Sequence, residues 1–295
     1  MNMPTKTKNI NEEENFNRLG FYALLTTQFQ GAFSDNVYKL IIILSVPLFL
    51  ATDSMWQRFV TPVCTVLFNI PWLLFPAIAG SLADRFSKQR VTVWTKVWEL
   101  GVMMMGGIAV FFRSPSLLLF TLFLMAMQSA FFSPAKYGII PEILPETRLP
   151  WGNGLLNLWT FIAIILGNAI GGWMMVVFKN DLYSVMFSMV ALSSIGLITS
   201  LFVTRTPPVE PQRKIELNPF AGLSGYFKIF FADKQLLLSM FGITYFWFAG
   251  ALVMQNIVEY GKVELSNAGA IGTLLALIAV GIAIGSTAAG YLSRG

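Results

Sequence analysis

The chain has 295 residues, of which 55% are hydrophobic and only 12% are charged. A soluble domain carries about twice that share of charged residues, so the composition excludes an ordinary soluble protein and favours membrane-spanning helices. The formal net charge is +5, but the lysines and arginines lie at the ends of apolar segments rather than in one patch, which argues against nucleic acid as a partner.

The sequence has no histidine and one cysteine, Cys64, which lies within an apolar segment. The usual ligand of zinc sites and the usual acid–base group near neutral pH are therefore missing, and no intrachain disulfide can form. No Walker-type glycine-rich loop is present, and no cluster of carboxylates resembles a metal site. We expect no catalytic site, no cofactor and no metal within these residues.

Residues 1–18 form a polar tail without the pattern of a cleaved secretory signal, so the first apolar segment is expected to direct insertion. Eight apolar stretches follow, each long enough to cross a bilayer or nearly so. The predicted spans are residues 19–50, 59–80, 91–112, 117–133, 155–178, 182–203, 236–258 and 268–292. We expect the second span to be broken by Pro62, Pro71 and Pro76.

The first span is unusual because it carries the polar residues Gln28, Gln30, Asp35, Asn36, Tyr38 and Lys39. A charged side chain in the membrane costs on the order of 3 kcal/mol and usually faces the bundle interior or a water-filled cavity. Asp35 and Lys39 are four residues apart on one helix face, so one interpretation is a structural ion pair. The other is a cavity-facing polar site, which the neutral polar residues nearby favour.

Residues 80–90, between the second and third spans, read Gly-Ser-Leu-Ala-Asp-Arg-Phe-Ser-Lys-Gln-Arg. They resemble the signature loop between helices 2 and 3 of the major facilitator superfamily, G-x-L-A-D-R-x-G-R-K. In this sequence Ser87 replaces the second glycine, and Gln89 shifts the run of basic residues by one position. Gly80 is interpreted as allowing a close approach of helices. The resemblance implies a cytoplasmic gating loop that latches the two halves of a transporter in one state. Its functional residues would be Gly80, Asp84, Arg85 and Arg90.

The basic residues predict the orientation. If the N-terminus lies in the cytoplasm, fifteen of the 20 lysines and arginines fall on cytoplasmic segments, four fall outside, and Lys39 lies within the membrane. Such an excess on one side is typical of cytoplasmic loops. The N-terminus is therefore predicted to be cytoplasmic.

Six spans, a basic proline-containing linker at residues 204–235, and further spans are the layout of the major facilitator fold, which consists of two six-helix halves. We predict an all-α membrane protein with the N-terminal half at residues 19–203 and the truncated start of the C-terminal half at residues 236–295. Residues 290–294 repeat the beginning of the loop at residues 80–90. Four helices of the usual twelve would then be absent, so we expect a fragment of a longer protein.

Two further stretches narrow the resemblance. Residues 31–36, Gly-Ala-Phe-Ser-Asp-Asn, and residues 132–142, Phe-Ser-Pro-Ala-Lys-Tyr-Gly-Ile-Ile-Pro-Glu, resemble the first and fourth helices of the bacterial lysophospholipid transporter family. The similarity covers most of residues 20–260. It implies a flippase that moves lysophospholipids, chiefly lysophosphatidylethanolamine, to the inner leaflet of the bacterial inner membrane for reacylation. Its partners would be the lysophospholipid and membrane lipids, and its mechanism alternating access.

By this resemblance, Asp35 would meet the ammonium of the head group or a gating partner, and Lys136 would meet its phosphate. Without the resemblance, Lys136 is equally well an ordinary basic residue of the cytoplasmic side. The family places a basic residue near Met254, where this sequence has the uncharged Gln255. The sequence therefore does not determine which head group is preferred. The residues assigned to the transport path are Gln30, Asp35, Asn36, Lys39, Lys136 and Gln255.

Two rival functions remain. One is a proton-coupled exporter of drugs or metabolites, in which Asp35 or Glu99 would titrate. The other is the membrane part of a fused phospholipid acyltransferase, because residues 245–251 look closer to transporters fused to an acyltransferase and an acyl-carrier-protein ligase. An enzyme domain would then follow residue 295.

Overall fold

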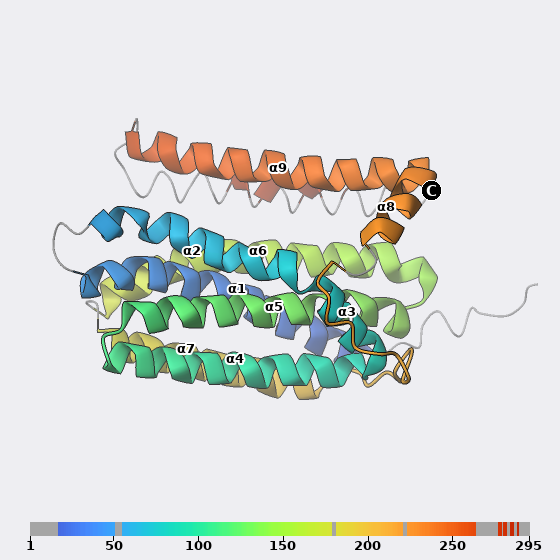
Figure 1. The fold of residues 1–295 in the computed structure, drawn as a ribbon, viewed down its shortest axis with the longest axis horizontal. Coiled ribbons are helices and arrows are strands. Elements are labelled where there is room, and N and C mark those ends of the chain that lie inside the picture. The colour runs from blue at the N-terminus through green and yellow to red at the C-terminus, as the bar shows by residue number, and fades with distance from the viewer. Residues whose placement is uncertain are drawn as a thin grey trace, which may run out of the picture. The chain divides into compact units, whose positions relative to one another are not determined.

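The computed structural model describes residues 17–50, 55–178, 181–220 and 223–263, together with residues 277, 278, 280, 281, 284, 285 and 288. Within these residues the regular elements are all helices (Figure 1). The described residues divide into two compact units, the first ending at Pro219 and the second running from Phe220 to Gly285.

The helices of the first unit are α1 (Arg18–Ser45), α2 (Met55–Leu74), α3 (Pro76–Arg85), α4 (Lys88–Phe111), α5 (Pro115–Ile143), α6 (Leu149–Val177) and α7 (Leu182–Leu201), with short 3₁₀ helices at Val46–Phe49 and Glu146–Arg148. Polar side chains cap several of them. The Asn17 side chain accepts a hydrogen bond from the Gly20 amide at the start of α1, and Ser114 and Asp181 cap α5 and α7 in the same way. The second unit contains α8 (Leu223–Ala232) and α9 (Lys234–Val263).

Helix α1 is the centre of the first unit: it packs against α5, α6 and α7, and most extensively against α6. Two glycines of α6 allow this close contact. A Cβ atom on Gly167 would lie 2.8 Å from the carbonyl oxygen of Phe33, and one on Gly171 would lie 3.2 Å from the Cα of Val37. Small residues at such a crossing let two helix backbones approach each other.

Prolines affect two of the predicted spans. The second span is broken at Pro76, as predicted: α2 and α3 are bent by 50° where α2 ends and Pro76 begins α3, whereas Pro62 and Pro71 lie inside α2. Proline has no amide hydrogen to donate, so one helix stops and another begins there. The fourth span was predicted to end at Ser133, but α5 continues to Ile143 through Pro134 and Pro141.

Length and composition alone qualify four described helical segments to cross a membrane: Arg18–Phe49, Pro115–Ile143, Glu146–Val177 and Leu182–Leu201. The bent pair of α2 and α3 makes a fifth if it counts as one span. Helix α4, the predicted third span, does not qualify; it carries Lys88, Arg90, Lys96 and Glu99. The predicted seventh span lies within α9, while the predicted eighth span and the repeated motif at residues 290–294 fall largely or wholly outside the described residues.

The buried residues of α1 form three layers along the helix. Phe21, Leu24 and Leu25 belong to one apolar cluster with residues of α5 and α6. Val37, Tyr38, Ile41 and Ile42 belong to a second cluster with residues of α2, α4, α5, α6 and α7. Six buried polar residues of α1 lie between these clusters: Thr27, Gln28, Gln30, Ser34, Asp35 and Asn36. We call this middle region the polar layer.

Candidate functional site

The polar layer is built from five helices, because the polar residues of α1 face polar residues of α4, α5, α6 and α7. The Thr27 hydroxyl lies 3.0 Å from that of Thr199 on α7. The Gln28 amide donates to the Thr160 hydroxyl of α6 over 2.9 Å. Hydrogen bonds between helices satisfy polar groups that would otherwise be costly inside an apolar bundle.

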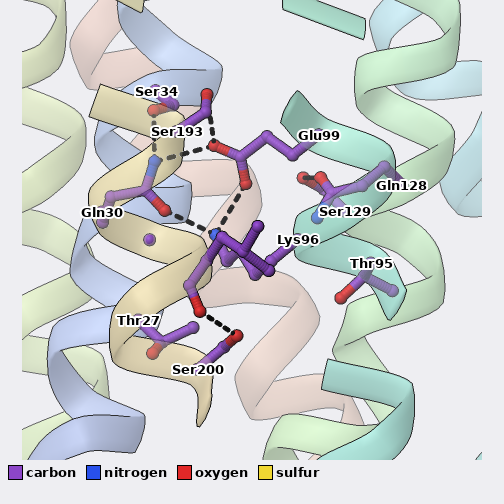
Figure 2. A network of polar contacts seen from close by, with 12 residues as sticks. Thr27, Gln30, Ser34, Thr95, Lys96, Glu99, Gln128, Ser129, Ser193 and Ser200 are labelled. Carbon is purple, nitrogen blue, oxygen red and sulfur yellow. Dashed lines mark hydrogen bonds and ion pairs between the residues drawn. The ribbon is translucent and has the colours of Figure 1, made fainter. Parts of the chain in front are cut away.

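An ion pair on α4 lies at the centre of the layer (Figure 2). The Lys96 ammonium contacts the Glu99 carboxylate over 2.7 Å, and neither side chain is exposed to solvent. The Gln30 side chain bridges both: its oxygen accepts from Lys96 and its nitrogen donates to Glu99, each over 2.7 Å. The hydroxyl of Ser193 on α7 donates to Glu99 over 3.4 Å. The pair is therefore neutralised and hydrogen-bonded within the protein, as a buried ion pair must be.

Two glycines make room for this network. A Cβ atom on Gly196 of α7 would lie 1.8 Å from the Gln30 side-chain oxygen, and one on Gly31 of α1 would lie 2.7 Å from the Lys96 ammonium. Both distances are shorter than side chains tolerate. The position of Gln30 therefore depends on the absence of a side chain at Gly196.

Only one of the two carboxylate oxygens of Asp35 is hydrogen-bonded. The Ser129 hydroxyl on α5 donates to its Oδ2 atom over 2.6 Å, whereas Oδ1 is buried and has no hydrogen-bond partner among the described residues. Only 8% of the residue is exposed. A buried carboxylate oxygen without a partner is unusual, because leaving it unpaired costs free energy.

Lys136 of α5 is a buried cation, opposite in charge to Asp35. It is also 8% exposed, and within the described ranges its ammonium makes no hydrogen bond and no ion pair. Its neighbours are the rings of Tyr137 and Phe132, whose centroids lie 5.0 and 5.8 Å from the ammonium. The layer thus contains a carboxylate with one unpaired oxygen and an unpaired ammonium, and within the described residues no hydrogen bond or ion pair joins them.

The ion pair between Asp35 and Lys39, one of the two interpretations of the polar residues in the first span, does not form. Lys39 donates instead to the Asn36 side-chain oxygen over 3.5 Å and lies 5.0 Å from the centre of the Phe68 ring. Asn36 also accepts from Asn168 of α6 over 3.3 Å. A spacing of four residues puts Asp35 and Lys39 on one face, but the long lysine side chain turns toward α2 while Asp35 faces Ser129 of α5.

The predicted gating loop is mostly helical. Gly80, Asp84 and Arg85 belong to α3 and Arg90 to α4, so only residues 86 and 87 connect the helices. A Cβ atom on Gly80 would meet no described atom within 4 Å, so the described residues contain no close contact that requires glycine at this position.

Asp84 binds the segment that follows α7. Its carboxylate contacts the Arg213 guanidinium over 2.7 Å, and its backbone oxygen accepts from the Glu210 amide over 2.9 Å. One turn earlier on α3, the Ser81 hydroxyl accepts from the Glu216 amide over 3.2 Å. Arg85 lies over the Phe86 ring at 5.6 Å, and Arg90 is exposed. Of the predicted gating residues, Asp84 thus contacts the segment that follows α7, and Arg90 lies at the surface.

Of the remaining predicted site residues, Gln255 lies on α9, and its side chain is outside the described residues. Sequence reasoning did not place Lys96 and Ser129 in the site. Nothing in the sequence distinguishes Ser129 from the other serines of the apolar segments. The described residues contain no group of three or more cysteine, aspartate or glutamate side chains arranged to hold a metal.

Comparison with known proteins gives matches over most of the chain. Residues 25–295 match the family model described as Major Facilitator Superfamily. A protein named lysophospholipid transporter LplT from Serratia proteamaculans is 29% identical over 272 residues, which cover 90% of this chain and 64% of the relative. A protein of the same name from Photorhabdus laumondii is 28% identical over 276 residues, which cover 92% and 65%. The chain thus spans just under two thirds of the length of these relatives.

Among solved structures, a crystal structure of a peptide transporter POT in complex with sulfate is 12% identical to the chain. The superposition has a TM-score of 0.48 and covers 82% of this chain and 50% of that one.

Proposed function

Because the chain belongs to the major facilitator superfamily, we propose that it forms part of a lysophospholipid transporter rather than an enzyme. The transporter moves lysophosphatidylethanolamine-like lipids to the inner leaflet of a bacterial inner membrane by alternating access. The chain is a multi-pass membrane protein, and the distribution of its basic residues supports a cytoplasmic N-terminus. The names and similarity of the relatives support the substrate class.

The pair formed by Asp35 and Lys136 carries the proposal. The free Oδ1 of Asp35 is an acceptor suited to the ammonium of an ethanolamine head group. The ammonium of Lys136, which lacks an ion-pair partner in the described part of the chain, is suited to the phosphate. A zwitterionic head group would therefore satisfy both residues at once, while the acyl chain stays in apolar surroundings.

The neighbouring residues have supporting roles. The polar groups of Lys96, Glu99 and Gln30 hydrogen-bond to one another. These residues therefore set the electrostatic environment next to the transport path and do not bind the head group. Asn36 and Lys39 extend the polar surface of α1, and Gln255 would contribute a neutral hydrogen-bonding group from the second half. Asp84, Arg85 and Arg90 act at the cytoplasmic end, where alternating access requires a contact that forms and breaks. An acyltransferase, fused or associated, would consume the delivered lipid.

The test is a transport assay on the full-length protein in proteoliposomes, with lysolipids that differ only in the head group. Lysophosphatidylethanolamine should be moved, and a monoacylglycerol with the same acyl chain, which offers neither charge, should be moved far more slowly. Equal rates for both lipids would contradict the role given to Asp35 and Lys136. Drug efflux that requires a proton gradient, without any movement of lipid, would instead establish the rival exporter.

A further inference from the structure

Lys39 of α1 is a second lysine of the bundle whose ammonium has no ion pair among the described residues. Its one hydrogen bond there goes to the Asn36 side-chain oxygen over a long 3.5 Å, and the centre of the Phe68 ring lies 5.0 Å away. An ammonium has three donors, and ordinary N–H···O hydrogen bonds are about 2.9 Å long. Lys96, by contrast, has two partners at 2.7 Å. Most of the hydrogen-bonding capacity of Lys39 is therefore unused.

The direction of the Lys39 side chain sets it apart from a lysine that merely reaches the membrane surface. A lysine in the last turns of a spanning helix usually extends toward the helix end, so that its ammonium lies in water or among head groups. Lys39 instead contacts Asn36, which comes three residues earlier in α1. Its ammonium is thus turned back toward the polar layer, and the residue is partly exposed, whereas Asp35 is buried.

Helices α1 and α5 run in opposite directions. The Tyr38 hydroxyl, near the end of α1, donates to Thr121 near the start of α5 over 2.7 Å. Asp35 accepts from Ser129 in the middle of α5, and the first residues of α1 share an apolar cluster with the last turns of α5. Residues that follow Ser129 in α5 therefore lie toward the start of α1.

Two cations without an ion pair in the described residues thus lie on opposite sides of one carboxylate. At a rise of about 1.5 Å per residue, the Cα atom of Lys39 lies about 6 Å beyond Asp35 toward the end of α1. The Cα atom of Lys136 lies about 10 Å beyond Ser129, the partner of Asp35, in the opposite direction. A head group that enters from the end of α1 meets Lys39 first, then Asp35, and Lys136 last.

We propose that Lys39 forms a first phosphate subsite, from which the lipid phosphate passes to Lys136 while the ammonium of the head group stays near Asp35. The inference rests on the proposed function and its cytoplasmic N-terminus, which puts the end of α1 on the outer side of the membrane. A charged group inside an apolar bundle is costly unless it is paired. A cation on each side of Asp35 gives the phosphate a partner before and after it moves. Lys39 thus serves capture from the outer leaflet, and Lys136 serves delivery.

The test measures initial rates of lysophosphatidylethanolamine uptake by spheroplasts that contain the full-length protein, over a range of lipid concentrations. Lys39→Gln should raise KM about tenfold or more, the effect of losing a hydrogen bond to a charged group. It should leave the maximal rate unchanged or higher, because the contact is made at capture and lost before delivery. Lys136→Gln should instead lower the maximal rate. Lys39→Arg, which keeps the charge, should keep KM close to that of the wild type.

Arg113→Gln is the matched control. Arg113 is an exposed cation between α4 and α5, at the end of the unit where α5 begins and α1 ends, and its loss should leave KM unchanged. Thermal unfolding in detergent checks the fold, and removing a cation from an apolar bundle should not lower the midpoint. Lys39→Met keeps the length and apolar stem of the side chain. It should behave like Lys39→Gln and keeps the test decisive if glutamine disturbs the packing.

Wild-type KM in the neutral Lys39 variants, or a lower maximal rate at unchanged KM, would overturn the first subsite. If Lys136→Gln is impaired in the same assay, the proposed function survives that result. An equal rise of KM in Arg113→Gln and Lys39→Gln would mean general attraction to positive charge and would overturn the subsite as well. A wild-type protein that takes up no lysophosphatidylethanolamine would overturn the proposed function and the subsite together.

Discussion

The Lys96 ammonium and the Glu99 carboxylate form an ion pair 2.7 Å long in which both side chains are completely buried. Removing one partner leaves the other as an uncompensated charge, which costs about 3–5 kcal/mol in comparable pairs. Lys96→Met or Glu99→Gln alone should therefore lower the thermal unfolding midpoint strongly. The double variant should recover much of the loss, because no unpaired charge remains. Additive losses in the double variant would show that the pair is not coupled in this way.

Gly196→Ala should destabilise the polar layer, because its Cβ atom would lie 1.8 Å from the Gln30 side chain. Forcing an extra methyl group into packed surroundings costs about 1–3 kcal/mol. Gly154→Ala is the control: a Cβ atom there meets nothing within 4 Å, and alanine favours the helix by about 1 kcal/mol relative to glycine. Thermal unfolding in detergent should separate the two variants, and equal midpoints would contradict the packing described here.

Asp35→Asn keeps the shape of the side chain and can keep the bond from Ser129, but it removes the charge offered to an ammonium group. We expect uptake of lysophosphatidylethanolamine to fall by about 10- to 100-fold, the effect of losing a hydrogen bond to a charged group. Expression and thermal unfolding should stay close to the wild type, because the unpaired oxygen is no longer charged. Normal uptake by a well-expressed Asp35→Asn protein would remove Asp35 from the transport path.

Lys136→Gln distinguishes a phosphate contact from an ordinary basic residue of the cytoplasmic side. We expect uptake of lysophosphatidylethanolamine to fall sharply in Lys136→Gln and to be partly retained in Lys136→Arg, which keeps the charge. The control is Lys214→Gln, which removes a cation outside the polar layer and should transport normally. If both glutamine variants transport like the wild type, Lys136 helps to orient the protein in the membrane and takes no part in transport.

Asp84→Asn should loosen the segment after α7, because Asp84 holds it through Arg213. Both side chains are about one third exposed, so the effect on global stability should be small. Limited trypsin digestion of the purified protein should become faster after Arg213 and Lys214. Glu146→Gln is the control, because Glu146 is exposed and remote from this contact in the sequence. Digestion at the wild-type rate would mean that the backbone hydrogen bonds alone hold the segment.

The sequence was a good guide to the helices and a poorer one to their junctions. Hydropathy located the helices because a span needs a long apolar run, and Pro76 marked the break in the second span, but the sequence could not show that α2 continues through Pro62 and Pro71 or that α5 continues past Pro134. Asp35 was recognisable because a carboxylate is rare in such a run. Ser129 was not, since hydroxyl side chains are common and only the fold shows which of them are buried. The pairing of Asp35 with Lys39 failed because spacing fixes a helix face, not the direction of a long side chain.

The three layers along α1 have a consequence for ion leakage. A proton moves through a protein along an unbroken file of water molecules and hydrogen-bonding groups. Phe21 and Leu24 interrupt such a file on one side of the polar layer, and Val37 and Ile41 interrupt it on the other. The polar layer of α1 thus lies between two apolar clusters, and a file of water that followed α1 from end to end would have to cross both of them.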